Sequence, residues 1–171
     1  IPEDRTKMGL VPEYSVAYNF ILQRYNDGEF KRSGFLLNMD SIGSFAKKLV
    51  QAFDVRTPSV NTSAANLSGG NQQKIILGRE IDRTPKLLVA VQPTRGLDIG
   101  ATEYIHKKLL AQREQGAAVL LISTELEEIL ALSDRIAVIY EGQIMGILPG
   151  DRSLTKTIGL MMAGVGENGA A

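Results

Sequence analysis

The sequence predicts an α/β fold in which a parallel sheet is covered by helices and preceded by a helical region. Two short apolar runs, 87–91 and 117–122, have the length and composition of buried parallel strands. Helical segments alternate with these runs, an order typical of a parallel sheet covered by helices. The first 66 residues instead carry apolar residues at helical spacing. We therefore expect three regions: residues 1–66, 67–150 and 151–171.

The composition excludes several classes of protein. The chain has 171 residues, enough for a domain with a hydrophobic core. Its 19 basic residues balance its 19 acidic ones, so charge favours neither nucleic acid nor an anionic membrane surface as a partner. With no cysteine and one histidine, neither a disulfide framework nor a metal centre is expected. No apolar run approaches the roughly 20 residues of a membrane-spanning helix.

Two helices are expected in the first region. The first covers residues 15–25, and the second begins after a cap at Asn38 or Asp40. Residues 55–66 contain Pro58 and several serines, threonines and asparagines, which favour a loop. The second helix carries apolar residues at helical spacing that define one buried stripe, namely Ile42, Phe45, Ala46, Leu49, Val50 and Phe53.

The later elements follow from apolar runs and turn residues. A helix should end before Pro85, another should end at Gly116, and Glu141-Gly142 favours a two-residue hairpin turn. The expected order is helix 71–82, strand 87–91, helix 101–115, strand 117–122, helix 125–132, strands 136–140 and 143–148, helix 153–162 and a disordered tail, 164–171.

One segment has the chemistry of a phosphate site. Residues 67–74 read Leu-Ser-Gly-Gly-Asn-Gln-Gln-Lys, which places two glycines behind Ser68 at the start of a helix. Glycines let the backbone approach an anion closely, and the unpaired first-turn amides and the positive end of the helix dipole favour a terminal phosphate. A pair of glycines alone is more often a plain turn, so the interpretation depends on the motifs that follow.

Those motifs, in their order, resemble the ATP-binding cassette (ABC) transporter ATPases. LSGGNQQK matches the family's signature motif, LLVAVQPTRGLD at 87–98 resembles the Walker B strand and D-loop, and LLISTELEE at 120–128 aligns with the switch segment. Pro2-Glu3-Asp4-Arg5 resembles the Q-loop segment of sugar-type importers. The resemblance implies an incomplete P-loop NTPase core with a helical subdomain, the latter within residues 1–66.

Other stretches of the sequence resemble the second, C-terminal ATPase half of a simple-sugar or nucleoside importer. The phrases IPEDR, NLSGGNQQ and QPTRGLDIGA carry this likeness, and FDVRTPS favours the nucleoside branch. Such ATPases work as head-to-tail pairs that hold ATP and Mg²⁺ between the halves. The resemblance therefore implies that the signature contacts the nucleotide of the partner half through Ser68, Gly69, Gly70, Asn71 and Gln72. It also places Glu3 at the Q-loop position and Asp98 in the D-loop.

The chain departs from the family pattern at its own hydrolytic site. Val91 replaces the aspartate that would organise magnesium, Gln92 replaces the glutamate that would polarise water, and Thr124 replaces the switch histidine. None of the 17 glycines is followed by lysine, so a Walker A loop is missing, as expected of a fragment that starts at the Q-loop. We expect no catalytic residue and no metal ligand here, no firmly bound cofactor, and no ATP hydrolysis by the fragment alone.

The resemblance also implies partners and a location. We expect the N-terminal ATPase half of the same chain, transmembrane permease subunits and, indirectly, a solute-binding protein, at the cytoplasmic face of a bacterial membrane. Without the first strands of the core, the sheet should expose an edge and apolar surface, so the fragment should self-associate or leave segments disordered. A regulatory or interaction module that kept the ABC fold without transport is the alternative. A soluble ABC ATPase acting on DNA repair or ribosomes fits poorly.

Three residue groups keep two interpretations each. Arg95 can form a salt bridge or subunit contact, or contact nucleotide. Asp98 can cap the following helix, contact the partner half, or do both. One set of residues near the first helix can pack in the core, which we favour, or face the membrane subunits: Tyr14, Val16, Tyr18 and Phe20.

Overall fold

A computed structural model describes residues 1–33 and 36–165 of the chain. The chain divides into two units, residues 1–120 and 121–171, and each is described by itself. The separate prediction of a boundary after residue 66 concerns subdomains inside the first unit. Across the described ranges, no helix is both long and apolar enough to span a membrane.

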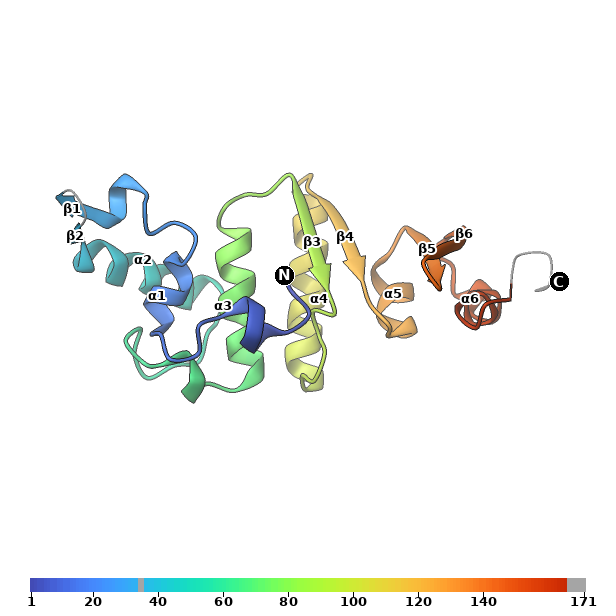
Figure 1. Cartoon of the computed structure of the whole chain (residues 1–171), viewed down its shortest axis with the longest axis horizontal. Coiled ribbons are helices and arrows are strands. Elements are labelled where there is room, and N and C mark those ends of the chain that lie inside the picture. The colour runs from blue at the N-terminus through green and yellow to red at the C-terminus, as the bar shows by residue number, and fades with distance from the viewer. Residues whose placement is uncertain (34–35, 166–171) are drawn as a thin grey trace. The chain divides into compact units, whose positions relative to one another are not determined.

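Short capped helices open the first unit (Figure 1). A single π-helical turn, η1 (Arg5–Gly9), precedes α1 (Val16–Ile21), and α2 (Met39–Ala52) follows a connecting segment. The side chain of Asn38 accepts a hydrogen bond from the Ser41 amide at 3.2 Å, which confirms one of the two predicted caps of α2. Helix α1 is shorter than predicted, because the chain continues from it as turns.

The predicted stripe of α2 lies in the core of this unit. Four of its six residues are buried, and Phe45 and Val50 pack against them half-buried. Val16 and Phe20 are also fully buried, which confirms the core interpretation for them, whereas Tyr14 is exposed. Burial of such apolar side chains is the main favourable contribution to folding of this helical region.

A small hairpin that the sequence analysis did not predict follows α1. The 3₁₀ turn η2 (Gly28–Phe30) leads into β1 (Lys31–Ser33), which pairs antiparallel with β2 (Leu36–Leu37). These strands are too short to show an alternating pattern. Arg24 supports the preceding turns, because its guanidinium group binds the carboxylates of Asp27, Glu29 and Asp82 and lies over the rings of Phe30 and Phe45.

Helix α3 (Gly69–Ile81) runs through the middle of the first unit, with α1 and α2 on one side and α4 (Ile99–Glu114) on the other (Figure 1). It begins two residues earlier than predicted, because both glycines belong to its first turn. The close approach of its neighbours requires Gly78, where a Cβ would lie 3.0 Å from Phe53 and 3.1 Å from Phe20. Helix α4 buries Ile105 and Leu109, as predicted.

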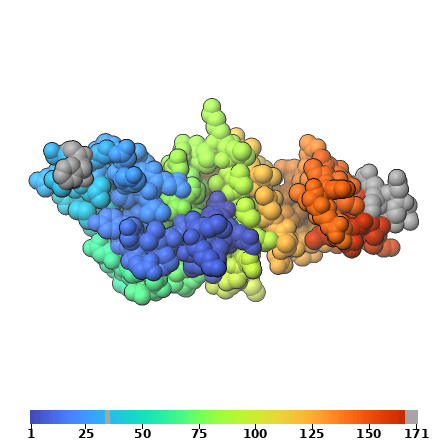
Figure 2. All heavy atoms as spheres, viewed as in Figure 1, coloured from blue at the N-terminus to red at the C-terminus, as the bar shows by residue number. Residues whose placement is uncertain are grey.

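Two neighbouring strands, β3 (Leu87–Val91) and β4 (Ala118–Ile122), form the sheet, with β4 crossing the boundary between the units. The other edge of β3 pairs with the first residue, since the Ile1 ammonium group donates to the Val89 carbonyl at 2.7 Å and the Val91 amide donates to the Ile1 carbonyl at 3.0 Å. Figure 2 shows the N-terminal segment (dark blue) lying against the yellow-green residues of this part of the chain.

The prediction that both strands are buried was wrong for one face of β3 and for β4, none of whose residues is buried. Leu88 and Ala90 of β3 are buried, but Leu87 is 57% exposed, Val89 37% and Leu120 51%. Successive strand residues point to opposite faces, so one face of β3 is covered and the other is open. The expected exposed apolar surface is thereby confirmed.

The second unit packs a β-hairpin against two helices. Helix α5 (Leu126–Leu132) precedes β5 (Arg135–Tyr140) and β6 (Gln143–Pro149), and the turn η4 (Arg152–Leu154) leads into α6 (Thr155–Met162). Glu141 and Gly142 have φ of 46° and 79°, which confirms the predicted two-residue turn. Leu130, Ile136, Val138, Ile158 and Met161 form the core. Of the tail predicted to be disordered, residues 166–171 lie outside the described part of the chain.

Candidate functional site

The signature turn begins at an exposed serine. Ser68 stands in extended conformation at the N-cap of α3, but its side chain does not cap the helix. Its hydroxyl instead accepts a hydrogen bond from the side-chain amide nitrogen (Nδ2) of Asn71 at 3.0 Å. The Asn71 amide oxygen accepts from the backbone amide of Arg56 at 2.8 Å. Asn71 thus joins the preceding loop to Ser68 and holds the hydroxyl at the start of the helix.

Both glycines of the motif have side chains of other residues close beside them. A Cβ at Gly69 would lie 2.7 Å from a terminal guanidinium nitrogen of Arg5. A Cβ at Gly70 would lie 3.0 Å from the Cβ of Ala101 at the start of α4. Approach of the backbone to an anion is one reason for this pair of glycines. The structure adds a second reason, because side chains of this same unit already occupy the space beside both glycines.

The two glutamines of the motif point into the protein. Both are buried, and Gln72 donates from its side chain to the Ala64 carbonyl at 2.9 Å. Gln73 donates to the Pro93 carbonyl at 2.8 Å and so connects α3 to the loop that follows β3. The predicted nucleotide contact of Gln72 stays a prediction. Gln73 was missed, and nothing in its sequence position distinguishes it from its neighbour.

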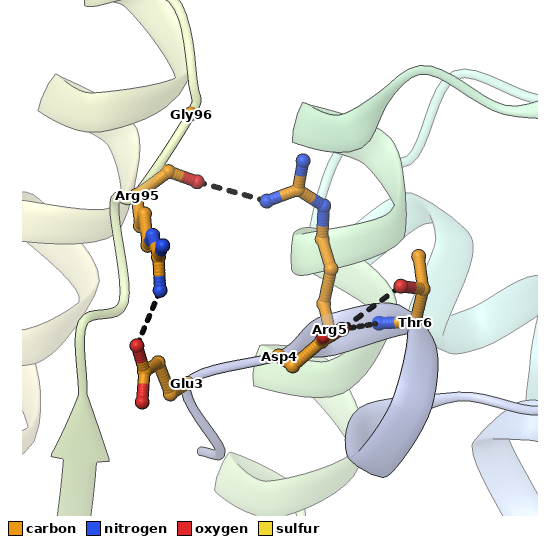
Figure 3. A pocket seen from close by; sticks show the side chains of 6 residues that line it. All are labelled: Glu3, Asp4, Arg5, Thr6, Arg95 and Gly96. Atoms are coloured by element: carbon orange, nitrogen blue, oxygen red, sulfur yellow. Dashed lines mark hydrogen bonds and ion pairs between the residues drawn. The ribbon is translucent and has the colours of Figure 1, made fainter.

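An open hollow of about 290 Å³ lies near the signature turn, because Arg5 lines the hollow and also approaches Gly69 (Figure 3). Glu3, at the Q-loop position, forms an ion pair with Arg95, which confirms the salt-bridge interpretation of that arginine. The Arg95 carbonyl accepts a hydrogen bond from Arg5 at 2.9 Å. The hollow is lined by Glu3, Asp4, Arg5, Thr6, Arg95 and Gly96.

Asp4 and Arg5 stabilise the wall of the hollow. The Asp4 carboxylate accepts from the amides of Lys7 and Thr6, both at 3.0 Å, and from the Thr6 hydroxyl at 2.8 Å. These bonds, first that of the Lys7 amide, lower the pKa of Asp4. The Nε of Arg5 is buried and has no hydrogen-bond partner among the described residues. Arg5 therefore contributes through its terminal nitrogens, which reach both Gly69 and Arg95.

The substituted hydrolytic positions lie at the end of β3 and in the second unit. Val91 ends the strand, and Gln92 follows in the left-handed region with φ of 47°. Asp98 caps α4 by accepting from the Ala101 amide at 2.8 Å, which confirms the capping interpretation. Thr124 belongs to the second unit, just before α5. In residues 1–33 and 36–165, no three histidine, cysteine, aspartate or glutamate side chains are grouped as metal ligands would be.

Curated relatives are nucleoside and sugar import proteins. The chain is 52% identical over 164 residues to the nucleoside import ATP-binding protein NupA of Lactococcus lactis and to the guanosine import ATP-binding protein NupO of Bacillus subtilis. Each match covers 96% of this chain and 32% of the relative. The glucose import ATP-binding protein TsgD13 of Haloferax volcanii is 44% identical, over 98% of this chain and 30% of its own length. The chain thus spans about a third of these relatives. No family model matches the sequence.

Solved structures with a similar fold are ABC cassettes. MJ1267, an ATP-binding cassette of an ABC transporter, superimposes with a TM-score of 0.70 at 22% identity, covering 95% of this chain and 66% of its own. The dimeric cassette MJ0796 bound to ADP and Pi gives a TM-score of 0.67 at 21% identity, covering 85% and 61%. These structural likenesses show the predicted ABC ATPase fold. The curated relatives, which are similar in sequence, are named as ATP-binding import proteins. The chain therefore has the fold of an ATP-binding cassette, and its sequence is similar, over nearly all of its length, to about a third of the length of ATP-binding proteins of nucleoside and sugar import.

Proposed function

We propose that this chain is the C-terminal nucleotide-binding half of an ABC importer ATPase that couples ATP binding and hydrolysis to uptake of a simple sugar or nucleoside. One observation carries the proposal. The signature turn at Ser68, Gly69 and Gly70 is complete and begins a well-packed helix, whereas Val91 and Gln92 stand where acidic residues would serve hydrolysis.

This contrast supports an asymmetric role for the half. The exposed Ser68 and the first turn of α3 contact ATP and Mg²⁺ that the partner half binds. The unpaired amides and the dipole of α3 favour the terminal phosphate at this end of the helix. The chain's own site lacks a carboxylate at 91 and 92 and contributes no general base. Glu3 and Arg95 hold each other there, and Asp98 caps α4 while remaining exposed to a partner surface.

The relatives' names favour the nucleoside branch of the proposal. Import proteins for a nucleoside and for guanosine are 52% identical, against 44% for a glucose import protein and 35% for a ribose import protein of Oceanobacillus iheyensis. The partners proposed are the N-terminal ATPase half of the same chain, membrane-spanning permease subunits and, indirectly, a solute-binding protein. The protein would then lie at the cytoplasmic face of the membrane.

The test is Ser68→Arg in the intact two-half protein. A large side chain at the N-cap should block access to the partner's nucleotide and reduce ATP turnover strongly. Ser44→Arg is the matched control, because Ser44 is also exposed but lies on α2. Turnover that survives Ser68→Arg would refute the asymmetric role. Failure to co-purify with permease subunits would favour the non-transport alternative.

A further inference from the structure

A buried lysine lies in the second turn of the signature helix. Lys74 is only 9% exposed, and its ammonium group donates to both the backbone carbonyl and a carboxylate oxygen of Asp54, each at 2.8 Å. The same nitrogen lies 4.4 Å from the centre of the Tyr104 ring. Burying a charge is unfavourable unless it is paired and hydrogen-bonded. Here the pairing comes from two different neighbours, the end of α2 and helix α4.

The backbone conformation of Asp54 allows two of its oxygens to bind Lys74. Asp54 follows the C-cap of α2 and has φ of 47°, a left-handed conformation that few residues other than glycine adopt. In that conformation both its carbonyl and its carboxylate reach the lysine. The hydrogen bond from Lys74 lowers the pKa of Asp54. The carboxylate itself is largely exposed, so the pair has one buried and one solvated partner.

A second lysine reaches the same end of α2 from α4. Lys108 donates to the Ala52 carbonyl at 3.4 Å and lies 4.9 Å from the Phe53 ring and 5.5 Å from that of Tyr104. Two cations therefore meet the negative end of α2, where they are favourable. Tyr104 takes part through its ring face, because its hydroxyl is buried without a hydrogen-bond partner among the described residues. Burial, and then the charge of Asp54, raises the pKa of Tyr104 to about 12.

We propose that Lys74 is a positioning residue that couples the orientation of the signature turn to the C-terminal end of α2. Lys74 follows Ser68 by six positions, about 9 Å along a helix that rises about 1.5 Å per residue. If the end of α2 shifts, the Asp54–Lys74 contact should therefore move the start of α3 with it, and the two helices should not slide past each other. This inference rests on the proposed function, in which that turn completes the partner half's ATP site.

The test uses the intact two-half protein with Lys74→Met and Lys74→Arg. We expect Lys74→Met to lower kcat about tenfold or more, within the roughly 10²-fold that misplacing a group can cause, while KM changes much less. Lys74→Arg should restore most of kcat, because a guanidinium group can bind the carboxylate and stack on Tyr104. Lys48→Met on α2 is the matched control, since Lys48 is exposed.

Further variants separate positioning from simple stabilisation. Asp54→Asn changes an exposed side chain, so it should leave the protein folded while lowering kcat in the same direction. Tyr104→Leu should lower kcat more than Tyr104→Phe, which keeps the ring. If Lys74→Met and Asp54→Asn lower the melting temperature but leave kcat of the folded protein unchanged, the proposal is overturned. Ser68→Arg, measured beside them, shows separately whether the proposed function fails.

Discussion

Glu3 and Arg95 form an ion pair although 92 positions separate them in the chain. The pair joins the Q-loop position to the loop that follows β3, and Arg5 adds a hydrogen bond to the Arg95 carbonyl. The side chain of Arg95 is 67% exposed and that of Glu3 46%, so water and salt weaken their attraction. The pair orders the rim of the hollow more than it stabilises the fold.

A double-mutant cycle with Glu3→Gln and Arg95→Gln tests this view. We expect a coupling free energy below about 1 kcal/mol, because the pair is solvent-exposed. Urea unfolding of the four proteins at low and high salt gives the coupling and its screening. A salt-independent coupling of several kcal/mol would contradict the assignment of the pair to the rim.

Side chains added at two helical glycines should have opposite effects. Gly43 lies in α2 with no atom within 4 Å of an added Cβ, so Gly43→Ala should stabilise the chain by up to about 1 kcal/mol through helix propensity. At Gly78 the added methyl would press on Phe53 and Phe20, and Gly78→Val should destabilise it by about 1–3 kcal/mol. Denaturant unfolding measures both, with Gly43→Val separating the effect of a branched side chain from the loss of space.

Gly150 in the second unit has no room for a side chain. A Cβ would lie 1.8 Å from the backbone carbonyl oxygen of Ser133, and the Gly150 amide donates to the Asp134 carbonyl at 3.0 Å. Because a backbone atom cannot move aside cheaply, Gly150→Ala should destabilise the unit by at least about 1–3 kcal/mol. Hydrogen exchange in β5 and β6 reports the loss. Gly159→Ala in α6, where nothing lies within 4 Å, should not accelerate exchange.

The stability of the chain should fall in acid. The hydrogen bond from Lys74 lowers the pKa of Asp54 below its ordinary 3.8, and amide hydrogen bonds do the same for Asp4 and Asp151. A lowered folded-state pKa stabilises the fold above the unfolded-state value, and this stabilisation is lost as pH falls through the folded-state value. Urea midpoints between about pH 7 and pH 2.5 should therefore drop below about pH 4. The Asp54→Asn variant should show a smaller drop in its urea midpoint. A drop as large as that of the unsubstituted chain would exclude a contribution from Asp54.

The open face of β3 should bind a second copy of the chain. Leu87 and Val89 are exposed apolar residues on a strand, a surface that favours association. Sedimentation velocity at rising concentration should show self-association, and Leu87→Lys should weaken it. Ile99→Lys is the matched control, because Ile99 is even more exposed but lies at the start of α4. A monomer at every concentration would contradict the expectation.

Much of the local structure could be predicted because its causes are local. The strand 87–91, the cap at Asn38 and the turn at Glu141-Gly142 depend on apolar spacing, side-chain capping and tolerance of positive φ. The hairpin of β1 and β2 was missed, because strands this short carry no period. The signature and the substituted positions 91 and 92 were visible in the order of motifs, which is preserved whatever the packing.

The sequence by itself determined the resemblance to ABC ATPases, the α/β class and the presence of a signature motif together with positions 91 and 92 that carry no carboxylate. Only the tertiary structure decided which side chains hold that turn. Arg5 beside Gly69, Gln73 on Pro93 and Lys74 on Asp54 are contacts between residues distant in sequence. Periodicity and turn chemistry act over a few residues, whereas these contacts depend on how α2, α3, α4 and the β3 loop pack together.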